Sequence, residues 1–360
     1  MKHLKGDRSK IFSKEMIWPR QFEIHLPADH KKSCNFNCFY CAGKYFNKSL
    51  YPWERTGLEL LDNLKGAIPY HIYGGAYTEP LLNPYYLTFL NMTKKYGNHF
   101  GMHTNGSLLK ELEENQGWLT ELARISTDRE DYLSVSLDAG TPESHCKTKG
   151  LKKDYFTDII EGIRLAVEAR KNTNPKGLAI RVCYLLNEFN SSEEEIRGII
   201  KIAKKIKVDS LRFSIPFASY AQQFDKVREY KRKVEDTQDR RLHGILEPLM
   251  SKSFDERPYI FYISPKYQDV NLFNFKHCIY GYYQITLGAD GYFYRCSTVA
   301  TPTMKHLRLG KITSDLDDFK KMIKKNQDVN FNTNTCFSHG ARCNRMGLDI
   351  NIEYKNWKSD

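Results

Sequence analysis

Three cysteines, Cys34, Cys38 and Cys41, lie within eight residues, with three and then two residues between them. A cubane iron–sulfur cluster normally takes four thiolate ligands. A run that supplies only three thiolates leaves one iron open to bind another molecule. Cys38 and Cys41 alone would also suit half of a zinc site, which is the alternative.

Four further cysteines, Cys278, Cys296, Cys336 and Cys343, follow towards the end of the chain. Asp290-Gly291 is typical of a hairpin turn, which would bring Cys278 and Cys296 together, and a later loop can supply the other two. Four thiolates make one closed cluster site. A structural zinc site is the alternative, because spacing alone separates the two kinds of site poorly.

The elements that must position these cysteines follow from hydrophobic periodicity between residues 20 and 220. Helical patterns occupy Leu58–Lys65, Phe156–Ala169 and Glu193–Ile206. Short apolar strands alternate with the helical segments, and six are predicted: Phe22–Leu26, Tyr70–Tyr73, His99–Thr104, Tyr132–Leu137, Leu178–Leu186 and Asp209–Ile215.

Six strands with helices between most of them indicate parallel βαβ units, and they are too few for a closed eight-stranded barrel. We therefore expect an α/β fold, an open partial (β/α)6 TIM-like barrel. Chemistry gathers at the carboxyl ends of such strands. The cysteine loop follows the first strand, so it is predicted to lie at that end.

The pattern changes beyond residue 255. Strands are predicted at Tyr259–Ser264, Tyr282–Leu287 and Tyr292–Arg295. We expect residues 1–254 to form the partial barrel with its connecting helices, and residues 255–360 to form a small α+β cysteine-rich domain.

The amino-acid composition indicates the cellular compartment and the classes of binding partner that we expect. No signal peptide or membrane-spanning run is evident, so the nine cysteines are expected to bind metal or stay reduced in the cytoplasm. The net charge of +12 lies largely in runs that read as solvated helix faces. No compact aromatic and basic motif would read bases, so no nucleic-acid partner is expected. An acidic peptide or a phosphorylated small substrate would fit the charge equally well.

The spacing of Cys34, Cys38 and Cys41, with Tyr40 before the last cysteine, resembles the radical SAM superfamily. In that family the open iron holds S-adenosylmethionine (SAM) through its amine and carboxylate. Three later segments also resemble the family: Tyr73-Gly-Gly-Ala-Tyr-Thr-Glu-Pro80, Thr104-Asn-Gly106 and Ser134-Val-Ser-Leu-Asp-Ala-Gly140.

The resemblance implies roles for individual residues. Tyr40 would lie near the adenine, and Gly74, Gly75 and Glu79 would meet the methionine amine, although Ala76, Tyr77 and Thr78 separate the glycines from Glu79 in this sequence. Ser136 and Asp138 are the candidates for the ribose or carboxylate, and Arg181 and Asn187 could also reach the cofactor. A structural ion pair is the alternative for Arg181.

The spacing around Cys278, Gly291 and Cys296 is similar to the SPASM and twitch subdomains, which carry auxiliary clusters in some radical SAM enzymes. A full SPASM domain needs more cysteines than this chain has. The resemblance therefore implies a twitch-like extension with one auxiliary [4Fe–4S] cluster on Cys278, Cys296, Cys336 and Cys343.

The chemistry implied is reductive cleavage of SAM to a 5′-deoxyadenosyl radical, which abstracts hydrogen from an unactivated C–H bond. We expect a reductant such as flavodoxin or ferredoxin. The substrate would be a small molecule, such as a sugar or aminocyclitol, or a peptide. The short segment before Cys34 favours the small molecule. The leading hypothesis is an oxidative modification in natural-product biosynthesis.

Two alternatives stay open. One is a redox-neutral radical SAM epimerase, in which Cys146 returns a hydrogen atom to the substrate. The other is a zinc- or cluster-binding protein without turnover. Cys183, which lies within a predicted strand, is interpreted as a small buried hydrophobe.

Overall fold

The computed structural model describes residues 4–28, 34–41, 52–75, 77–215, 239–263, 277–337, 343 and 345–357. Its centre is one ten-stranded sheet with the strand order β10-β9-β8-β1-β2-β3-β4-β5-β6-β7. The strands are β1 Gln21–Ile24, β2 Tyr70–Tyr73, β3 His99–Thr104, β4 Tyr132–Ser136, β5 Ala179–Leu185, β6 Ser210–Ser214, β7 Tyr259–Ile263, β8 Gln284–Leu287, β9 Tyr292–Tyr294 and β10 Arg308–Lys311.

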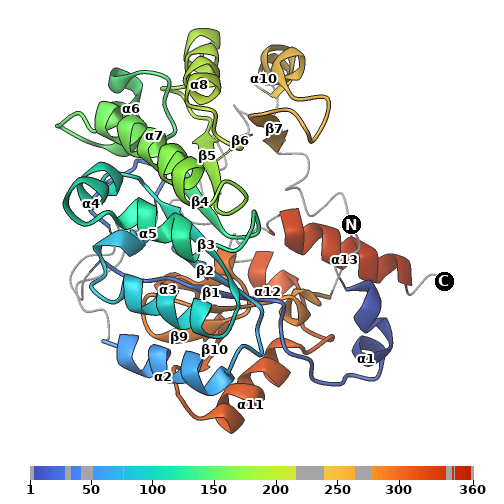
Figure 1. Ribbon diagram of the computed structural model, residues 1–360. Coiled ribbons are helices and arrows are strands. Elements are labelled where there is room, and N and C mark those ends of the chain that lie inside the picture. Colours follow the sequence, from blue (N-terminus) through green and yellow to red (C-terminus); the bar gives the residue numbers. More distant parts are fainter. Residues whose placement is uncertain are drawn as a thin grey trace.

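Helices follow most of the parallel strands and cover the outer face of the sheet (Figure 1). The described helices are α1 Arg8–Phe12, α2 Glu54–Leu64, α3 Tyr86–Lys95, α4 Leu109–Gln116, α5 Trp118–Ile125, α6 Pro142–Lys149, α7 Phe156–Thr173, α8 Glu193–Ile206, α10 Asp239–Leu246, α11 Leu316–Asn326, α12 Asn334–Phe337 and α13 Arg345–Trp357.

Strands β1 to β7 pair in parallel with their sequence neighbours. The α/β class and the parallel, barrel-like arrangement predicted from the sequence are confirmed. Strand β8 pairs in parallel with the other edge of β1, and β9 and β10 continue from it in antiparallel order. The sequence analysis did not predict β10, a four-residue strand with Gly310 at its third position.

The two faces of the sheet have different character, because successive side chains of a strand point to opposite faces. On β4, Leu133 and Val135 are fully buried in the main hydrophobic core beneath the helices. Tyr132 and Ser134 line a cavity on the opposite face. The inner face of the sheet therefore carries the polar side chains.

Helix α6 begins with a capping box at Thr141, whose side chain accepts from the Ser144 backbone N–H. Glu195 on α8 fastens the same point, because its carboxylate accepts from the backbone N–H of Gly140 at 2.7 Å and from the Thr141 hydroxyl at 2.5 Å. Two helices that follow different strands are thus fixed to each other near the carboxyl end of β4.

Strand β7 lies beyond the boundary expected near residue 255, yet it extends the same sheet through β6. Strands β8 and β9 extend the opposite edge. The division into residues 1–254 and 255–360 stays a prediction, and the sheet is continuous across it.

Helices α1 and α13, near the two ends of the chain, lie side by side (Figure 1). Arg8 donates to the Trp357 carbonyl at 2.8 Å, and the rings of Phe12 and Tyr354 are 6.0 Å apart. A second hydrophobic cluster forms here, and Cys278 and Cys296 pack against it. Among the described residues, no helix has the length and hydropathy that crossing a bilayer requires.

Candidate functional site

The loop that carries Cys34, Cys38 and Cys41 follows β1 and docks on the end of α6. The backbone N–H of Asn37 donates to the Lys149 carbonyl at 3.1 Å, and that of Phe39 donates to the Thr148 carbonyl at 3.3 Å. Gly150 ends α6 with φ +63°, and a Cβ there would lie 2.3 Å from the Asn37 carbonyl oxygen. Only glycine lets the loop approach this closely.

Hydrogen-bond donors surround the first sulfur. The Cys34 Sγ accepts from the Phe36 backbone N–H at 3.4 Å and from the Asn105 amide at 3.5 Å. Burial, with the Glu79 charge nearby, raises the pKa of the Cys34 thiol to about 12. A thiol must lose its proton to ligate iron, so metal binding at this site releases a proton.

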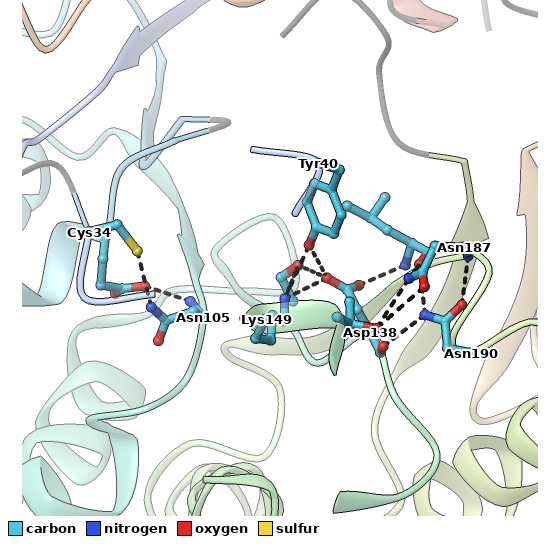
Figure 2. Close-up of polar contacts among 11 residues, drawn as sticks. Cys34, Tyr40, Asn105, Asp138, Lys149, Asn187 and Asn190 are labelled. Atoms are coloured by element: carbon cyan, nitrogen blue, oxygen red, sulfur yellow. Dashed lines mark hydrogen bonds and ion pairs between the residues drawn. The ribbon is translucent and has the colours of Figure 1, made fainter. Parts of the chain in front are cut away.

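Asp138 organises the region behind the cysteine loop (Figure 2). Its carboxylate accepts from the Tyr40 hydroxyl at 2.7 Å, from Ser136 at 2.8 Å and from the Leu185 backbone N–H at 2.7 Å. It also pairs with the Lys149 ammonium at 2.5 Å, and both of these side chains are almost completely buried.

The Lys149 ammonium is close enough to the cysteine loop for its charge to affect the pKa of the Cys38 thiol. Burial raises the pKa of Cys38, and the positive charge of Lys149 opposes that rise. The Asp138 charge keeps the pKa of Lys149 above its ordinary value despite burial. The network therefore holds one cation in the protein interior beside the predicted ligands.

Gly74 and Gly75 follow β2 in a crowded turn. Gly74 has φ +99°, and a Cβ there would lie 2.4 Å from the His103 carbonyl oxygen, whereas a Cβ on Gly75 would meet the His25 ring at 2.3 Å. These glycines thus allow close packing of the loops after β1, β2 and β3.

Glu79, predicted to meet the SAM amine, is buried and binds the neighbouring loop. Its carboxylate accepts from the Thr104 hydroxyl at 2.7 Å, from the Asn105 backbone N–H at 2.6 Å and from the Leu81 backbone N–H at 3.2 Å. Burial raises its pKa to about 7. In this arrangement the carboxylate joins the loops after β2 and β3, and its contact with the amine stays a prediction.

Arg181 lies apart from this network. Its guanidinium carbon stands 3.8 Å from the centre of the Tyr132 ring, and the side chain lines a cavity on the inner face of the sheet. No ion pair involves Arg181 among the described residues, so the alternative of a structural ion pair gains no support there. Asn187 hydrogen-bonds to the Leu185 carbonyl at 3.0 Å and, with Thr148, closes the loop after β5.

The structure brings the later four cysteines together. Cys278, Cys296, Cys336 and Cys343 line one cavity with the guanidinium-bearing Arg295. Burial, together with the charges of the other three thiolates, raises the pKa of the Cys343 thiol. Within the described part of the chain, no three Cys, His, Asp or Glu side chains converge as a single-ion site.

The other two cysteines lie in different surroundings. Cys183 is buried on β5 with its sulfur 3.1 Å from the Ser134 hydroxyl. Cys146 lies on α6, with its sulfur 3.7 Å from the Lys153 carbonyl oxygen on the exposed side of the helix. The role of Cys146 as a hydrogen donor stays a prediction.

Comparison with known proteins identifies a family domain in part of the chain. Residues 30–197 match the model of the radical SAM superfamily. The chain carries a radical SAM domain. The match includes the cysteine loop, Glu79, Asp138 and Lys149.

Among curated proteins, the chain is 28% identical over 227 residues to a probable GTP 3′,8-cyclase of Thermococcus kodakarensis, covering 59% of this chain and 67% of the relative. Among solved structures, it is similar to anSMEcpe with bound AdoMet, with a TM-score of 0.57, 16% identity and coverage of 94% of this chain and 95% of that one.

It is also similar to Streptococcus suis SuiB bound to the precursor peptide SuiA, with a TM-score of 0.51 and 14% identity. The match covers 83% of this chain and 64% of the SuiB chain. At these identities the likeness to the solved structures shows a shared fold.

The residues of this radical SAM domain fit the cofactors that the family implies, a [4Fe–4S] cluster and SAM. Three thiols come from one loop at the carboxyl end of the sheet, and Asn105 and the Phe36 N–H donate to the first of them. Donors aimed at sulfur favour the thiolate form that a cluster needs.

Sequence reasoning missed Lys149 and did not give Asn105 a role of its own. Lys149 follows Cys146 by three residues in a polar helix and carries no local signal of burial. Asn105 lies in the Thr104-Asn105-Gly106 segment that resembles the family, and its position directly after β3 was the available signal.

Proposed function

We propose that this chain is a radical SAM enzyme that abstracts hydrogen from an unactivated C–H position, with Cys34, Cys38 and Cys41 holding the SAM-binding cluster. When bound, the reduced cluster and SAM supply a 5′-deoxyadenosyl radical. The observation that carries the proposal is the docking of the three-cysteine loop on α6 beside the buried Lys149–Asp138 pair.

The chain's own residues position and enclose these groups. Asp138 fixes the Tyr40 hydroxyl, which keeps the ring of Tyr40 in one place at the predicted adenine position. Asn105 links the loop after β3 to Cys34. Fixed polar groups of this kind orient a cofactor without reorganising during the reaction.

We further propose that Cys278, Cys296, Cys336 and Cys343 hold one auxiliary [4Fe–4S] cluster. The shared cavity that these four thiols line supports this ligand set. Such a cluster would accept an electron from the substrate radical and give a net oxidation. A structural zinc ion at the same thiols is the competing assignment.

The substrate class also belongs to the proposal. The curated relative is named for a reaction of GTP, a small phosphorylated molecule, whereas SuiB is described with a precursor peptide. The sequence match to the cyclase favours a small molecule.

Anaerobic reconstitution of the full chain with iron, sulfide, SAM and a reductant tests the proposal. We expect formation of 5′-deoxyadenosine and about eight iron atoms per chain, four for each cubane. Exchange of Cys34 and Cys38 for Ala should abolish 5′-deoxyadenosine and remove about half of the iron. Exchange of Cys278 and Cys296 should remove the other half.

Cys183→Ala is the matched control, because it removes a thiol outside both proposed ligand sets. Its iron content should equal that of the wild type. Zinc without iron in the reconstituted wild type, or no 5′-deoxyadenosine, would contradict the proposed activity.

Cys146→Ala tests the epimerase alternative. Loss of product with continued SAM cleavage would support a hydrogen donor at Cys146, and unchanged product would reject it.

A further inference from the structure

A cavity of about 460 Å³ lies on the inner face of the sheet, between β3 and β7. Its volume is within the range of small-molecule binding sites, which is roughly 300–1,000 Å³. Polar lining comes from His103, Tyr132, Arg181, Asp209 and Arg212 among others. The mechanism proposed above gives this cavity no role.

The charge of the lining is strongly positive. Four arginines line the cavity, Arg129, Arg181, Arg212 and Arg257, against one carboxylate, Asp209. Asp209 is already occupied, since it pairs with Arg129 at 2.6 Å and also with Arg170. The carboxylate in the wall therefore does not neutralise the inner arginines.

Arg181 and Arg212 are the inner pair, on the neighbouring strands β5 and β6. No ion pair is formed by either guanidinium within the ranges that the structure describes. The Nε of Arg212 is buried and has no hydrogen-bond partner there. A buried donor without an acceptor is costly, so it marks a place where an acceptor from a ligand would stabilise the protein.

The groups beside this pair are held in defined positions. Arg181 stacks on the Tyr132 ring at 3.8 Å, and the Tyr132 hydroxyl lies 2.8 Å from the His103 Nε2. Burial and the two nearby arginines lower the pKa of His103 to about 3, so this ring is neutral near pH 7. The positive charge at the cavity thus comes from arginines alone, and stacking fixes the plane of one of them.

The strand register fixes the depth of the pair within the sheet. Arg212 pairs in register with Cys183, and Cys183 with Ser136, so Arg212 lies at the same level of the sheet as Ser136. Arg181 lies one two-residue step deeper, about 7 Å towards the amino ends of the strands. From this pair the cavity continues to the amino ends of β5, β6 and β7, where Ala179, Ser210 and Tyr259 line it.

Two guanidinium groups without ion-pair partners suit a ligand with two negative charges better than they suit a single carboxylate. The N–H groups of each guanidinium can also bind two phosphate oxygens at once. We propose that Arg181 and Arg212 bind the phosphate group of a phosphorylated small-molecule substrate. This inference rests on the proposed function and names the substrate class of that enzyme.

Binding of inorganic pyrophosphate to the reconstituted full chain, measured by calorimetry, tests the assignment. We expect saturable binding to the wild type that weakens by about tenfold or more in Arg212→Gln and in Arg181→Gln. Arg212→Lys keeps the charge without the fork and should also weaken binding. Tricarballylate, a tricarboxylate that like pyrophosphate carries about three negative charges near pH 7, should bind the wild type at least about tenfold more weakly.

Arg197→Gln is the matched control, because Arg197 is exposed on α8 and pairs with Glu193 at 2.7 Å. It should bind pyrophosphate as the wild type does. Thermal unfolding of each variant identifies those that fail to fold. If the glutamine variants fail to fold, the pyrophosphate affinity of Arg212→Lys is compared with that of the wild type instead. No saturable binding, equal losses in Arg197→Gln and Arg212→Gln, or equal affinity for tricarballylate would overturn the phosphate site.

Formation of 5′-deoxyadenosine by the wild type is measured separately in the same preparation. Pyrophosphate binding without 5′-deoxyadenosine would leave the phosphate site standing and reject the proposed activity. The opposite result would reject the phosphate site alone.

Discussion

At the scale of single residues, Lys149 combines two properties that oppose each other. Its ammonium is withdrawn from water, which is costly, and it is paired with the equally buried Asp138. Removal of one partner of a buried pair leaves an uncompensated charge, which costs more than the pair contributes when intact. The pair thus makes the packing of α6 against the cysteine loop sensitive to a single substitution.

Lys149→Met should lower the free energy of unfolding by about 3–5 kcal/mol, because Asp138 would stay buried without its counter-charge. Urea unfolding of the iron-free chain measures this change. The variant should also take up less iron on reconstitution, because the Asn37 and Phe39 N–H groups bind to the same end of α6.

Lys147→Met on the same helix is the control. Lys147 pairs with Glu143 at 2.6 Å, but both side chains are more than half exposed, so its loss should leave the free energy of unfolding nearly unchanged. Equal destabilisation by the two substitutions would contradict the account of Lys149.

The sequence identified the cysteines by type and spacing, and it identified Tyr40 by position. It could not identify Lys149, because a lysine in a polar helix is ordinarily exposed and its burial depends on the loop after β1, more than one hundred residues earlier in the chain. Arg212 was missed for a related reason. Its importance comes from facing the same cavity as Arg181, which is a property of the strand register.

At the scale of elements, the end of α6 positions the cysteine loop through backbone contacts. Gly150 and Gly117 both end helices with φ +63°, so alanine would be strained equally at either position. They differ in their surroundings. A Cβ at Gly117 would meet nothing within 4 Å, whereas one at Gly150 would lie 2.3 Å from the Asn37 carbonyl oxygen.

Gly117→Ala should therefore cost about 1–2 kcal/mol of stability, the cost of left-handed backbone in an L-residue, with normal iron content. Gly150→Ala should cost more and should also displace the cysteine loop, so that less iron is retained after reconstitution. Iron content and urea unfolding of the two variants distinguish strain from loop displacement. Equal iron content in both would show that α6 does not position the loop.

The elements themselves were largely predictable. Observed α8 coincides with the predicted helix Glu193–Ile206, because Ile196, Ile199 and Ile200 repeat with the helical period and are all buried. Strand β10 was missed because it is short and has no apolar alternation. Its pairing depends on β9, which supplies a hydrogen-bonding partner that local sequence does not reveal.

At the scale of the whole molecule, one sheet connects the predicted SAM end to the four-cysteine cavity. Strand β8 pairs directly with β1, which leads into the first cysteine loop. Cys278 precedes β8 and Cys296 follows β9, so the two cysteine groups are attached to neighbouring strands of one sheet. The sequence analysis predicted a boundary between these regions near residue 255 from a change in the pattern of strands and helices. Such a change does not indicate which strands become neighbours in the sheet.

The distribution of buried titratable groups also gives the molecule a defined response to pH. Burial lowers the pKa of His71 to about 4, of His103 to about 3 and of His145 to about 4, from an ordinary value of 6.5. Below pH 6.5 these histidines bind protons in the unfolded chain but stay neutral in the folded chain. Each histidine therefore lowers the free energy of unfolding by about 1.4 kcal/mol per pH unit as the pH falls through this window.

Glu79 acts in the opposite direction. Its folded pKa of about 7 lies above the ordinary 4.5, so its contribution is full below pH 4.5 and is lost as the pH rises to 7. Between pH 6.5 and 4.5 the three histidines bind three protons more in the unfolded chain, and Glu79 binds one more in the folded chain. The unfolded chain therefore binds two protons more than the folded chain. We expect the iron-free chain to lose stability on acidification through that range, on the order of 3 kcal/mol per pH unit.

Urea unfolding at several pH values between 7 and 4.5 measures this slope, and His71→Gln isolates one contribution. His71 lies behind the sheet, with its Nδ1 2.9 Å from the Thr93 hydroxyl, away from the cysteine loop. The glutamine variant should be less stable at pH 7 but should show a slope smaller by about 1.4 kcal/mol per pH unit, because one group no longer titrates. An unchanged slope would mean that His71 has the same pKa in the folded and the unfolded chain, which its burial opposes.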